Sequence, residues 1–247
     1  MSGTRTVPSD AALQAFGSSR LSRGRGPLKR LLRNRAAGVG AVIILVIVLA
    51  AILAPLIAPD DPYKQNLVDS LQGPSASHLF GTDSLGRDVL SRVIYGGRIT
   101  IPVSMAAVII ALLIGVPIGL ASGYWRGWTD TIIMRLTDIL LAFPSLLLAM
   151  AIMASLGVHL WTISVAIAIT SIPIYVRLVR GEVLRLRDRE FVDAARCIGV
   201  DDRTIIFRHI LPNGLSPIII QASLNAALAI LNVSALSFIG LGAQPPS

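Results

Sequence analysis

AAGVGAVIILVIVLAAILAPLIA, residues 36–58, points to a membrane protein before any other part of the sequence is considered. Its 23 residues carry no charge. As an α-helix such a stretch extends roughly 34 Å, enough to cross a hydrocarbon core of about 30 Å. A cleaved signal peptide is the competing interpretation, but the 35-residue basic leader and the long apolar run both exceed that pattern. We therefore predict a first transmembrane helix here.

The composition of the whole chain is that of a membrane protein. Of its 247 residues, 53% are hydrophobic and 15% are charged, against roughly 25% charged residues in soluble domains. The net charge is +8, but the basic residues flank apolar runs, which favours membrane topology over nucleic-acid binding. The single cysteine, Cys197, excludes an internal disulfide framework and a cysteine-based metal cluster, and we expect it to pack on its helix.

Further charge-free runs predict further crossings. One lies between Arg98 and Arg126 and contains Pro102 and Pro117. Prolines are tolerated inside membrane helices because neighbouring groups satisfy the carbonyls they leave free. The last predicted crossing runs over residues 215–241.

Residues 131–176 carry only two charges, Arg135 and Asp138. As one helix these 46 residues would extend roughly 69 Å, so we expect two crossings with a turn at residues 157–159. Asp138 is the ionisable group that proton-coupled transport would need, but an ion pair with Arg135 on the same helix face is the simpler interpretation. Together the runs predict five spans in an all-α polytopic membrane helical bundle.

Lysine and arginine are unevenly distributed among the connections. Residues 1–36 and 177–213 hold eight each, whereas residues 59–98 hold four, offset by five aspartates. With the N-terminus in the cytoplasm, both groups of eight lie on the cytoplasmic side, as the positive-inside rule requires. The predicted division is a cytoplasmic leader (1–35), a first span (36–58), an external loop with an amphipathic helix (59–98) and a core domain (99–247) that contains the cytoplasmic loop 177–213.

The cytoplasmic loop has the pattern of two short helices around a glycine. Gly199 follows an apolar stripe, and we expect it to adopt the left-handed conformation that ends a helix. Asp201 or Asp202 can cap a second helix, which we expect Pro212 to stop. The stripe consists of Phe191, Ala194, Ala195 and Ile198, at spacings of three and four residues. From these patterns alone, an ordinary amphipathic loop at the membrane surface is an equally good interpretation.

The residues of this loop and their spacing resemble the EAA loop of ABC importer permeases. In that family the loop docks into a groove on the ATP-binding subunit and transmits its motion to the spans. Asp193 stands where the family usually has Glu, so the charge is retained on a shorter side chain. The resemblance rests on Asp193, Ala194, Ala195, Gly199, Ile210, Leu211 and Pro212.

A second stretch, HLFGTDSLGRDVLSRVIYGGRITI (residues 78–101), resembles permeases of the dipeptide, oligopeptide and nickel importers. Its pattern predicts a turn, then an amphipathic helix, then release of the chain into the membrane at Gly96-Gly97. An ordinary interfacial helix explains the amphipathic pattern but not the GTD and GRD groups. Arg87, Asp88 and Arg92 are the charges expected to face a binding protein. The motif residues are Gly81, Thr82, Asp83, Gly86, Arg87, Asp88 and Arg92.

The two resemblances together imply the type I permease fold of ABC importers in a bacterial inner membrane. That fold has six spans, of which we expect five here, with the chain ending on GLGAQPPS. The implied partners are a second, homologous permease, two ATP-binding subunits, an extracytoplasmic solute-binding protein and membrane lipid, with no nucleic acid. We expect no cofactor on this chain, with ATP and Mg bound by the partner subunits.

Motifs of catalysis are missing from the sequence. It has no G-x-x-x-x-G-K-[ST], no H-E-x-x-H and no G-x-S-x-G, so we expect no enzyme activity in this chain. The resemblance implies import of dipeptides or oligopeptides, with nickel or a nickel chelate as the alternative. A membrane scaffold that recruits ATPases without transport is the alternative from another class.

Polar residues also occur within the last span. Gln221, Asn225 and Asn232 fall on one face of a helix. They could line a polar translocation pathway, or they could form hydrogen bonds with neighbouring helices. The sequence leaves both interpretations open.

Overall fold

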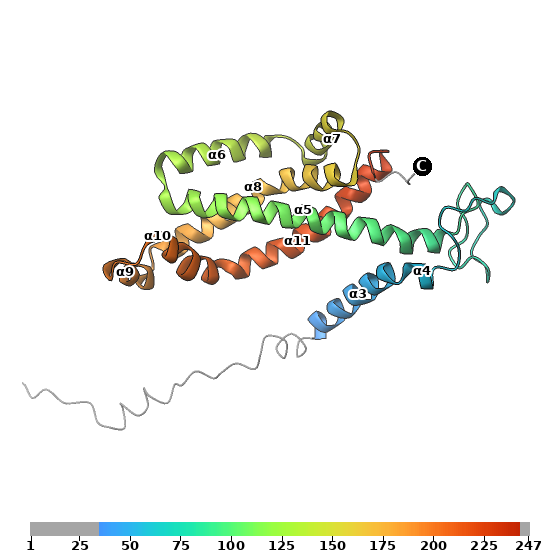
Figure 1. Ribbon diagram of the computed structural model, residues 1–247, viewed down its shortest axis with the longest axis horizontal. Helices are drawn as coiled ribbons and strands as arrows, with labels where there is room; N and C mark the ends of the chain where they lie inside the picture. Colours follow the sequence, from blue (N-terminus) through green and yellow to red (C-terminus); the bar gives the residue numbers. More distant parts are fainter. Residues whose placement is uncertain (1–34, 243–247) are drawn as a thin grey trace, which may run out of the picture. The chain divides into compact units, whose positions relative to one another are not determined.

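Apart from an isolated bridge between Thr82 and Asp88, every regular element in the residues described, 35–242, is helical in this computed structural model. The all-α prediction is confirmed (Figure 1). The leader before residue 35 and the chain end after residue 242 lie outside the described residues. The elements are α3 (Arg35–Ile52), α4 (Ala54–Ile57), the 3-10 turn Leu67–Asp69, α5 (Val89–Trp125), α6 (Gly127–Ala142), α7 (Ser145–Leu156), α8 (Leu160–Arg187), α9 (Glu190–Cys197), α10 (Asp202–Thr204), the π-helical segment Ile205–Ile210 and α11 (Leu211–Phe238).

Four of these helices are long and apolar enough to cross a membrane: α3, α5, α8 and the continuous helix Asp202–Phe238. The pair α6 and α7 supplies a fifth crossing if it is counted as one bent span. The predicted turn at residues 157–159 is confirmed, since α7 ends before Gly157 and α8 begins at Leu160. Residues 35–242 thus contain four candidate spans, or five if the bent pair is counted as one, as befits a polytopic membrane protein.

A bend of 92° separates α6 from α7, and it was not predicted. It lies at Phe143-Pro144, where Phe143 has a ψ angle of 135°. A residue before proline is driven from the helical region because the proline ring crowds its backbone. The apolar run hid this break, because hydropathy does not distinguish a straight helix from a broken one.

Helix α5 runs without interruption through Gly96-Gly97, so the predicted release of the chain at these glycines is wrong. The amphipathic helix and the second span are one helix of 37 residues. A glycine inside a helix costs only about 1 kcal/mol relative to alanine, which packing elsewhere in the helix can offset. Pro102 and Pro117 lie inside the same helix.

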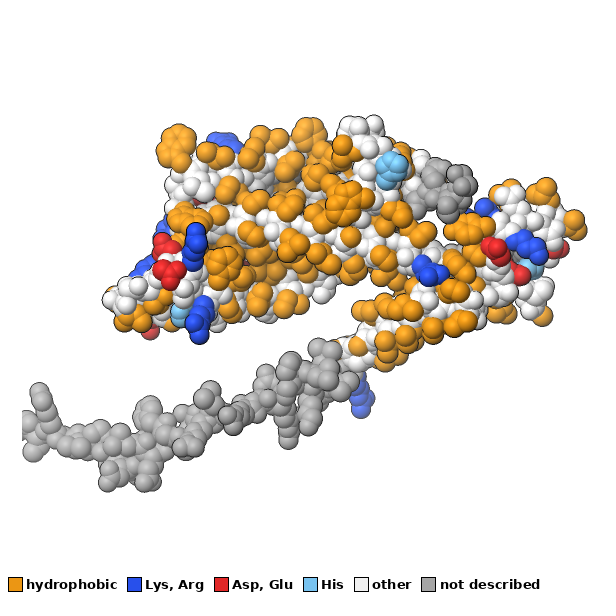
Figure 2. All heavy atoms as spheres, viewed as in Figure 1, with side chains coloured by type: hydrophobic (Ala, Val, Ile, Leu, Met, Phe, Trp, Pro, Cys, Tyr) orange, Lys and Arg blue, Asp and Glu red, His pale blue; other side chains and the backbone are white. Residues whose placement is uncertain are grey.

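The flank of the bundle is almost wholly hydrophobic, whereas charged side chains gather towards its ends (Figure 2). On α11, for example, Ile219, Leu224 and Leu231 are 57–64% exposed. Helix α3, most of which belongs to a separate compact unit that ends at Ala50, also carries exposed aliphatic side chains along its length. Such surfaces suit contact with lipid or with other apolar helices rather than with water.

The most extensive helix pairing joins α5 and α8, and it depends on three glycines of α5. Gly115, Gly119 and Gly123 recur every fourth residue, as in the small-residue stripes that let membrane helices approach closely. A Cβ atom built on Gly119 would lie 2.7 Å from the Cβ of Val179 and 2.8 Å from the carbonyl oxygen of Val176. The three glycines face Tyr175, Val179 and Val183 of α8.

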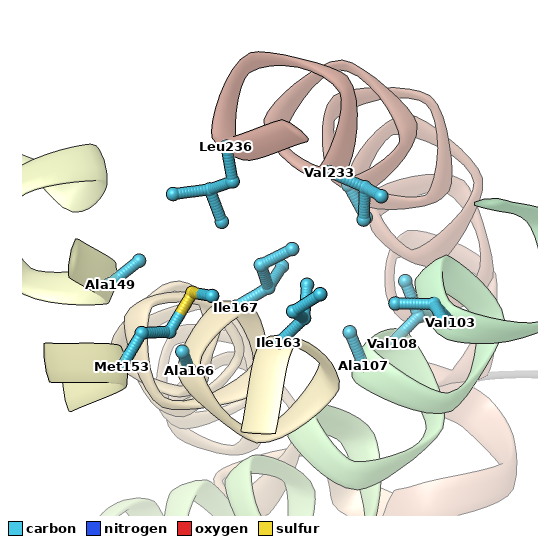
Figure 3. Close-up of a cluster of buried hydrophobic side chains, with 11 residues drawn as sticks. Val103, Ala107, Val108, Ala149, Met153, Ile163, Ala166, Ile167, Val233 and Leu236 are labelled. Atoms are coloured by element: carbon cyan, nitrogen blue, oxygen red, sulfur yellow. The ribbon is translucent and has the colours of Figure 1, made fainter. Parts of the chain in front are cut away.

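Aliphatic side chains from four helices close one end of this pair (Figure 3). Met153 of α7 and Ile163 of α8 are both 0% exposed, and Leu236 of α11 packs against the same cluster. The cluster comprises Val103, Ala107, Val108, Ala149, Met153, Ile163, Ala166, Ile167, Ala229, Val233 and Leu236. It holds α7 and the end of α11 against the α5–α8 pair.

The close approach of α5 and α8 predicts that two glycine-to-alanine substitutions in α5 change the free energy of unfolding in opposite directions. Gly119→Ala forces the α8 backbone to shift, so we expect a loss of about 1–3 kcal/mol in the free energy of unfolding. Gly96→Ala meets no atom within 4 Å and removes a flexible residue from a helix, so we expect a gain of roughly 0.5–1 kcal/mol. Denaturant unfolding in detergent, followed by tryptophan fluorescence, measures both. Equal effects would contradict the proposed role of the glycine stripe.

Candidate functional site

The corner segment, residues 189–211, turns the chain between α8 and α11. Helix α8 continues to Arg187, well beyond the predicted end of the span at residue 176. Helix α9 then ends at Gly199, whose φ is +80°, as expected for this residue. Gly199 N–H donates to the carbonyl of Arg196 at 2.9 Å, and Val200 N–H donates to that of Ala195 at 3.0 Å. This pair of bonds is the Schellman motif, which satisfies the last carbonyls of a helix.

The second half of the corner segment begins with a capped helix. The side chain of Asp201 accepts a hydrogen bond from Thr204 N–H at 3.0 Å, which identifies it as the cap of α10. The expected stop at Pro212 is wrong, because one helix continues from Asp202 to Phe238. Pro212 lies in the first turn of α11, directly after a π-helical segment in which Leu211 N–H reaches the carbonyl of Ile206. The wider π turn makes room there for the proline ring.

The buried face of α9 is not the predicted stripe. Val192 and Ala195 are buried, whereas the other stripe residues, Phe191, Ala194 and Ile198, are exposed. Two turns of helix have room for only one narrow line of contact, and the spacing of three from Val192 to Ala195 supplies it. The exposed residues, spaced three and four apart, form an outward apolar line.

The segment is held to the bundle by a second buried cluster. Ile205, Ile206 and Ile210, each at most 4% exposed, pack with Val183 and Leu186 of α8. Of the other motif residues, Leu211 is half-buried, whereas Pro212 is exposed. The π-helical segment therefore forms the inner side of the corner, and α9 forms its outer side.

The charged and sulfur-containing side chains of α9 lie outside. Asp193 pairs with Arg196 at 3.3 Å, with the Asp193 side chain 61% exposed, so this pair adds little stability. Cys197 is exposed, and the expectation that it packs on its helix is wrong. Its side chain follows the outward side of α9, where the helix has no neighbour to bury it.

The connecting loop, residues 58–88, lies at the opposite end of the bundle (Figure 1) and is organised around Asp83. The Asp83 carboxylate accepts hydrogen bonds from Leu85 N–H at 2.9 Å, from Arg87 N–H at 3.0 Å and from Arg87 Nε at 2.8 Å. Arg92 also donates to it. Partial burial would raise the pKa of Asp83, but the two backbone N–H groups and the Arg87 guanidinium outweigh it and lower the pKa to about 2.

Asp88 fixes the start of α5. Its carboxylate accepts a hydrogen bond from Ser91 N–H at 2.7 Å and lies 3.2 Å from His78 Nδ1. The Ser91 hydroxyl in turn accepts from Asp60 N–H at 3.1 Å. Partial burial would raise the pKa of Asp88, but the bonds from Ser91 and His78 lower it. At 2% exposed, Asp88 cannot present its charge to a partner.

The glycines and the threonine of the GTD and GRD groups serve the fold of the same loop. A Cβ atom on Gly81 would lie 2.4 Å from the carbonyl oxygen of Gln72, and one on Gly86 would lie 1.7 Å from that of Asn66. The Thr82 hydroxyl accepts from Gln72 N–H at 2.9 Å. The residues of the GTD and GRD groups and Arg92 therefore lie close together. Among their charged side chains, that of Arg92 is the most exposed, at 42%.

The polar residues of α11 lie in different surroundings. Gln221 Nε2 donates to Asn225 Oδ1 at 3.4 Å. Asn225 is 4% exposed, and its Nδ2 has no hydrogen-bond partner within the described part of the chain. Asn232 is half-buried further along the helix. The three residues share a helix, but no hydrogen bond recorded among residues 35–242 joins Asn232 to the other two.

Asp138 pairs with Arg177 of α8 at 2.7 Å, so the expected local pair with Arg135 is wrong. Nearer the start of α6, Asp130 accepts two bonds from Arg180, at 2.5 Å and 2.7 Å. Sequence spacing favoured a neighbour on the same helix, but α8 packs alongside α6 and brings its own arginines closer. These pairs tie α6 to α8.

Sequence analysis missed the glycine stripe of α5, although its signal, a glycine at every fourth position, is readable in residues 115–123. It also missed Arg180 and Tyr124, because their contacts cross between helices. Within residues 35–242 no group of three or more His, Cys, Asp or Glu side chains could hold a metal ion.

Two family matches cover most of the chain. Residues 115–247 match the family described as "Binding-protein-dependent transport system inner membrane component". Residues 22–74 match "N-terminal TM domain of oligopeptide transport permease C". The first match contains the whole corner segment.

Similar proteins cover nearly all of the chain. It is 49% identical over 222 residues to the dipeptide transport system permease protein DppC of Alkalihalophilus pseudofirmus, over 90% of this chain and 73% of that protein. It is 42% identical over 219 residues to the glutathione transport system permease protein GsiD of Pectobacterium atrosepticum, over 88% of this chain and 73% of that protein. It is 44% identical over 220 residues to GsiD of Escherichia coli O157:H7, over 89% and 73%.

The bonds at Asp83 predict how the connecting loop responds to charge loss and to acid. Asp83→Asn removes the carboxylate that accepts from Arg87 and Arg92, so we expect to lose about 2 kcal/mol of local stability. Because the folded pKa lies near 2, below the ordinary value of 3.8, this stability is present above pH 4 and is lost as the pH falls towards 2. Hydrogen–deuterium exchange at Leu85 and Arg87 measures both effects. Asp61→Asn, which changes an exposed aspartate bonded to Tyr63 N–H, is the matched control and should leave these amides unchanged.

Proposed function

Because this chain belongs to the family of inner membrane components of binding-protein-dependent transport systems, we propose that it forms half of the transmembrane pathway of an importer for small peptides. It is a multi-pass permease of an ABC transporter. The observation that carries the peptide proposal is the 49% identity to a dipeptide permease over 90% of the chain.

The proposed orientation places the N-terminus and the corner segment in the cytoplasm of a bacterial cell, across its inner membrane. Residues 1–36 and 177–213 hold eight lysines and arginines each, and such charges are retained on the cytoplasmic side. The connecting loop then faces outward. The proposed domains follow: leader 1–35, first span 36–58, external loop 59–98 and core 99–247.

In this proposal the corner segment docks on an ATP-binding subunit. The outward apolar line of Phe191, Ala194 and Ile198 is exposed on a helix that is itself anchored to α8 and α11. An amphipathic helix with a free apolar face suits a groove on a partner. Two such subunits bind ATP and Mg and carry out the hydrolysis, and this chain binds no cofactor.

The movement that we propose is a rigid-body one. When ATP binding closes the ATP-binding subunits, the corner segment moves with them and shifts the spans between inward-facing and outward-facing arrangements. Its internal hydrogen bonds at Gly199 and Asp201 make it stiff enough for this role. A second, homologous permease completes the pathway, and Gln221, Asn225 and Asn232 are proposed to border it.

An extracytoplasmic solute-binding protein is the proposed partner of the connecting loop. Next to that loop, in the first turn of α5, Arg92 donates to Asp83 and its side chain is still 42% exposed, whereas Arg87 and Asp88 are less exposed and engaged within the loop. A rim charge on an interface affects mainly the rate of encounter. Solute selection then rests largely with that protein.

Glutathione is the second candidate solute, because two of the similar permeases carry its name at 42% and 44% identity. The decisive test is uptake of labelled dipeptide, glutathione and nickel by cells deleted for this gene and complemented with it. We expect restored uptake of dipeptide. Restored uptake of nickel alone would overturn the peptide proposal, and a chain that reaches the membrane but restores no uptake would support a scaffold.

The left-handed conformation of Gly199 predicts that two substitutions at this position reduce solute uptake to different extents. A Cβ atom would meet nothing within 4 Å, so the cost of substitution arises from the left-handed backbone, at roughly 1–2 kcal/mol. Gly199→Val should therefore abolish most uptake while ATP hydrolysis persists. Gly199→Asn should retain most uptake, because asparagine tolerates this conformation. Uptake and ATP hydrolysis in membrane vesicles check both, and normal uptake by Gly199→Val would contradict the rigid corner.

A further inference from the structure

Tyr124, next to the end of α5, lies where four helices meet. It is 6% exposed. Two guanidinium groups, those of Arg187 and Arg196, lie over its ring, with their central carbons each 5.8 Å from the ring centroid. Its hydroxyl donates a hydrogen bond to Asp202. One side chain thus contacts the end of α8, the last turn of α9 and the start of α10.

Two of these contacts belong to the corner segment. Arg196 and Asp202 lie on either side of the turn at Gly199, so Tyr124 contacts both arms of the corner. Among the hydrogen bonds and cation–π contacts of residues 35–242, those that join α5 to the corner segment all use this side chain. Leu120 adds apolar packing against the same cluster.

Arg187 also joins α8 to the end of α5 through the backbone of Tyr124. It donates to the backbone carbonyl of Tyr124 at 2.7 Å, one of the carbonyls that the end of a helix leaves free. This bond does not depend on the tyrosine side chain. The ends of α5 and α8 therefore stay joined when the side chain changes, whereas the polar contacts from α5 to the corner segment are lost.

We propose that Tyr124 is the positioning residue through which movement of the corner segment reaches α5. The inference rests on the proposed function, in which that segment docks on an ATP-binding subunit. The ring, in contact with two arginines and bonded through its hydroxyl to Asp202, makes the corner and the end of α5 move together. Such a contact between the corner segment and α5 affects the amount of solute transported per ATP hydrolysed, and not the rate of ATP hydrolysis.

The test compares three variants in the complete transporter, reconstituted in proteoliposomes with its second permease, ATP-binding subunits and solute-binding protein. The readout is labelled dipeptide transported per ATP hydrolysed. Tyr124→Phe keeps the ring contacts with both arginines and loses the bond to Asp202, and Tyr124→Leu loses both the ring contacts and the bond. We expect the ratio to fall roughly fivefold for Tyr124→Phe and more for Tyr124→Leu, with ATP hydrolysis retained.

Tyr95→Leu is the matched control. Tyr95 is also on α5 and has Arg98 over its ring at 5.8 Å, but it lies at the opposite end of the helix. We expect its coupling ratio to equal that of the unchanged chain. A purely structural role for Tyr124 would lower the amount of assembled transporter but leave the ratio unchanged, and that result would overturn the proposal.

Asp202→Asn supplies a milder variant, and its combination with Tyr124→Phe forms a double-mutant cycle. If both act only through this bond, the double variant should show the same ratio as Tyr124→Phe alone. Additive losses would overturn the role of this bond.

A second measurement does not depend on transport. The exposed Cys197 lies on α9, so maleimide labelling and hydrogen exchange of residues 190–204 report on the corner segment in the purified chain. We expect both to be faster for Tyr124→Leu and unchanged for Tyr95→Leu. If the unchanged transporter moves no dipeptide, the proposed function fails, and these rates still decide whether Tyr124 holds the corner. Equal rates in all variants would overturn the inference.

Discussion

The close approach of α5 and α8 is the constraint on which the rest of the bundle depends. At Gly119 there is no room for a Cβ atom beside Val179, so two long helices lie against each other as one unit. The aliphatic cluster with Met153 and Leu236 packs on one end of this pair. The cluster with Ile205 and Ile210 packs on the other. The bundle therefore has α5 and α8 as its central pair, with α11 packed against both ends of the pair, α7 at one end and the corner segment at the other.

Most of the charged side chains in the described motifs are used to build the protein. Asp83 orders the connecting loop and Asp88 caps α5, while Asp130 binds Arg180 across two helices. A buried or partly buried carboxylate is stable only when its hydrogen bonds are satisfied. Surface available to partners is consequently provided by other residues, such as the apolar side chains of α9 and, next to the loop, Arg92 of α5.

The corner segment combines a rigid interior with a free outer face. The Schellman bonds at Gly199 and the cap at Asp201 fix its two arms, and buried isoleucines seat it on the spans. The π-helical turn then carries the chain directly into α11 without a break. In the function that we propose, this continuity matters, because a flexible link between the docking surface and the span would absorb the motion instead of transmitting it.

The amino-acid sequence was enough to predict the helical class, the turn at residues 157–159 and the left-handed corner at Gly199, whereas of the five predicted spans four are single long helices and the fifth depends on counting the bent pair α6 and α7 as one. These features follow from local properties: uncharged length, charge distribution and the conformational freedom of glycine. It did not determine the bend before Pro144, the passage of α5 through Gly96-Gly97 or the continuation of the helix through Pro212. The same local signals stop a helix in one place and are accommodated in another, according to the packing around them. Only the tertiary structure decided that Asp138 pairs with Arg177, that Val192 rather than Phe191 is buried, and that Tyr124 joins the corner to the bundle. Each of these contacts is between helices, and their partners are set by which helix faces meet.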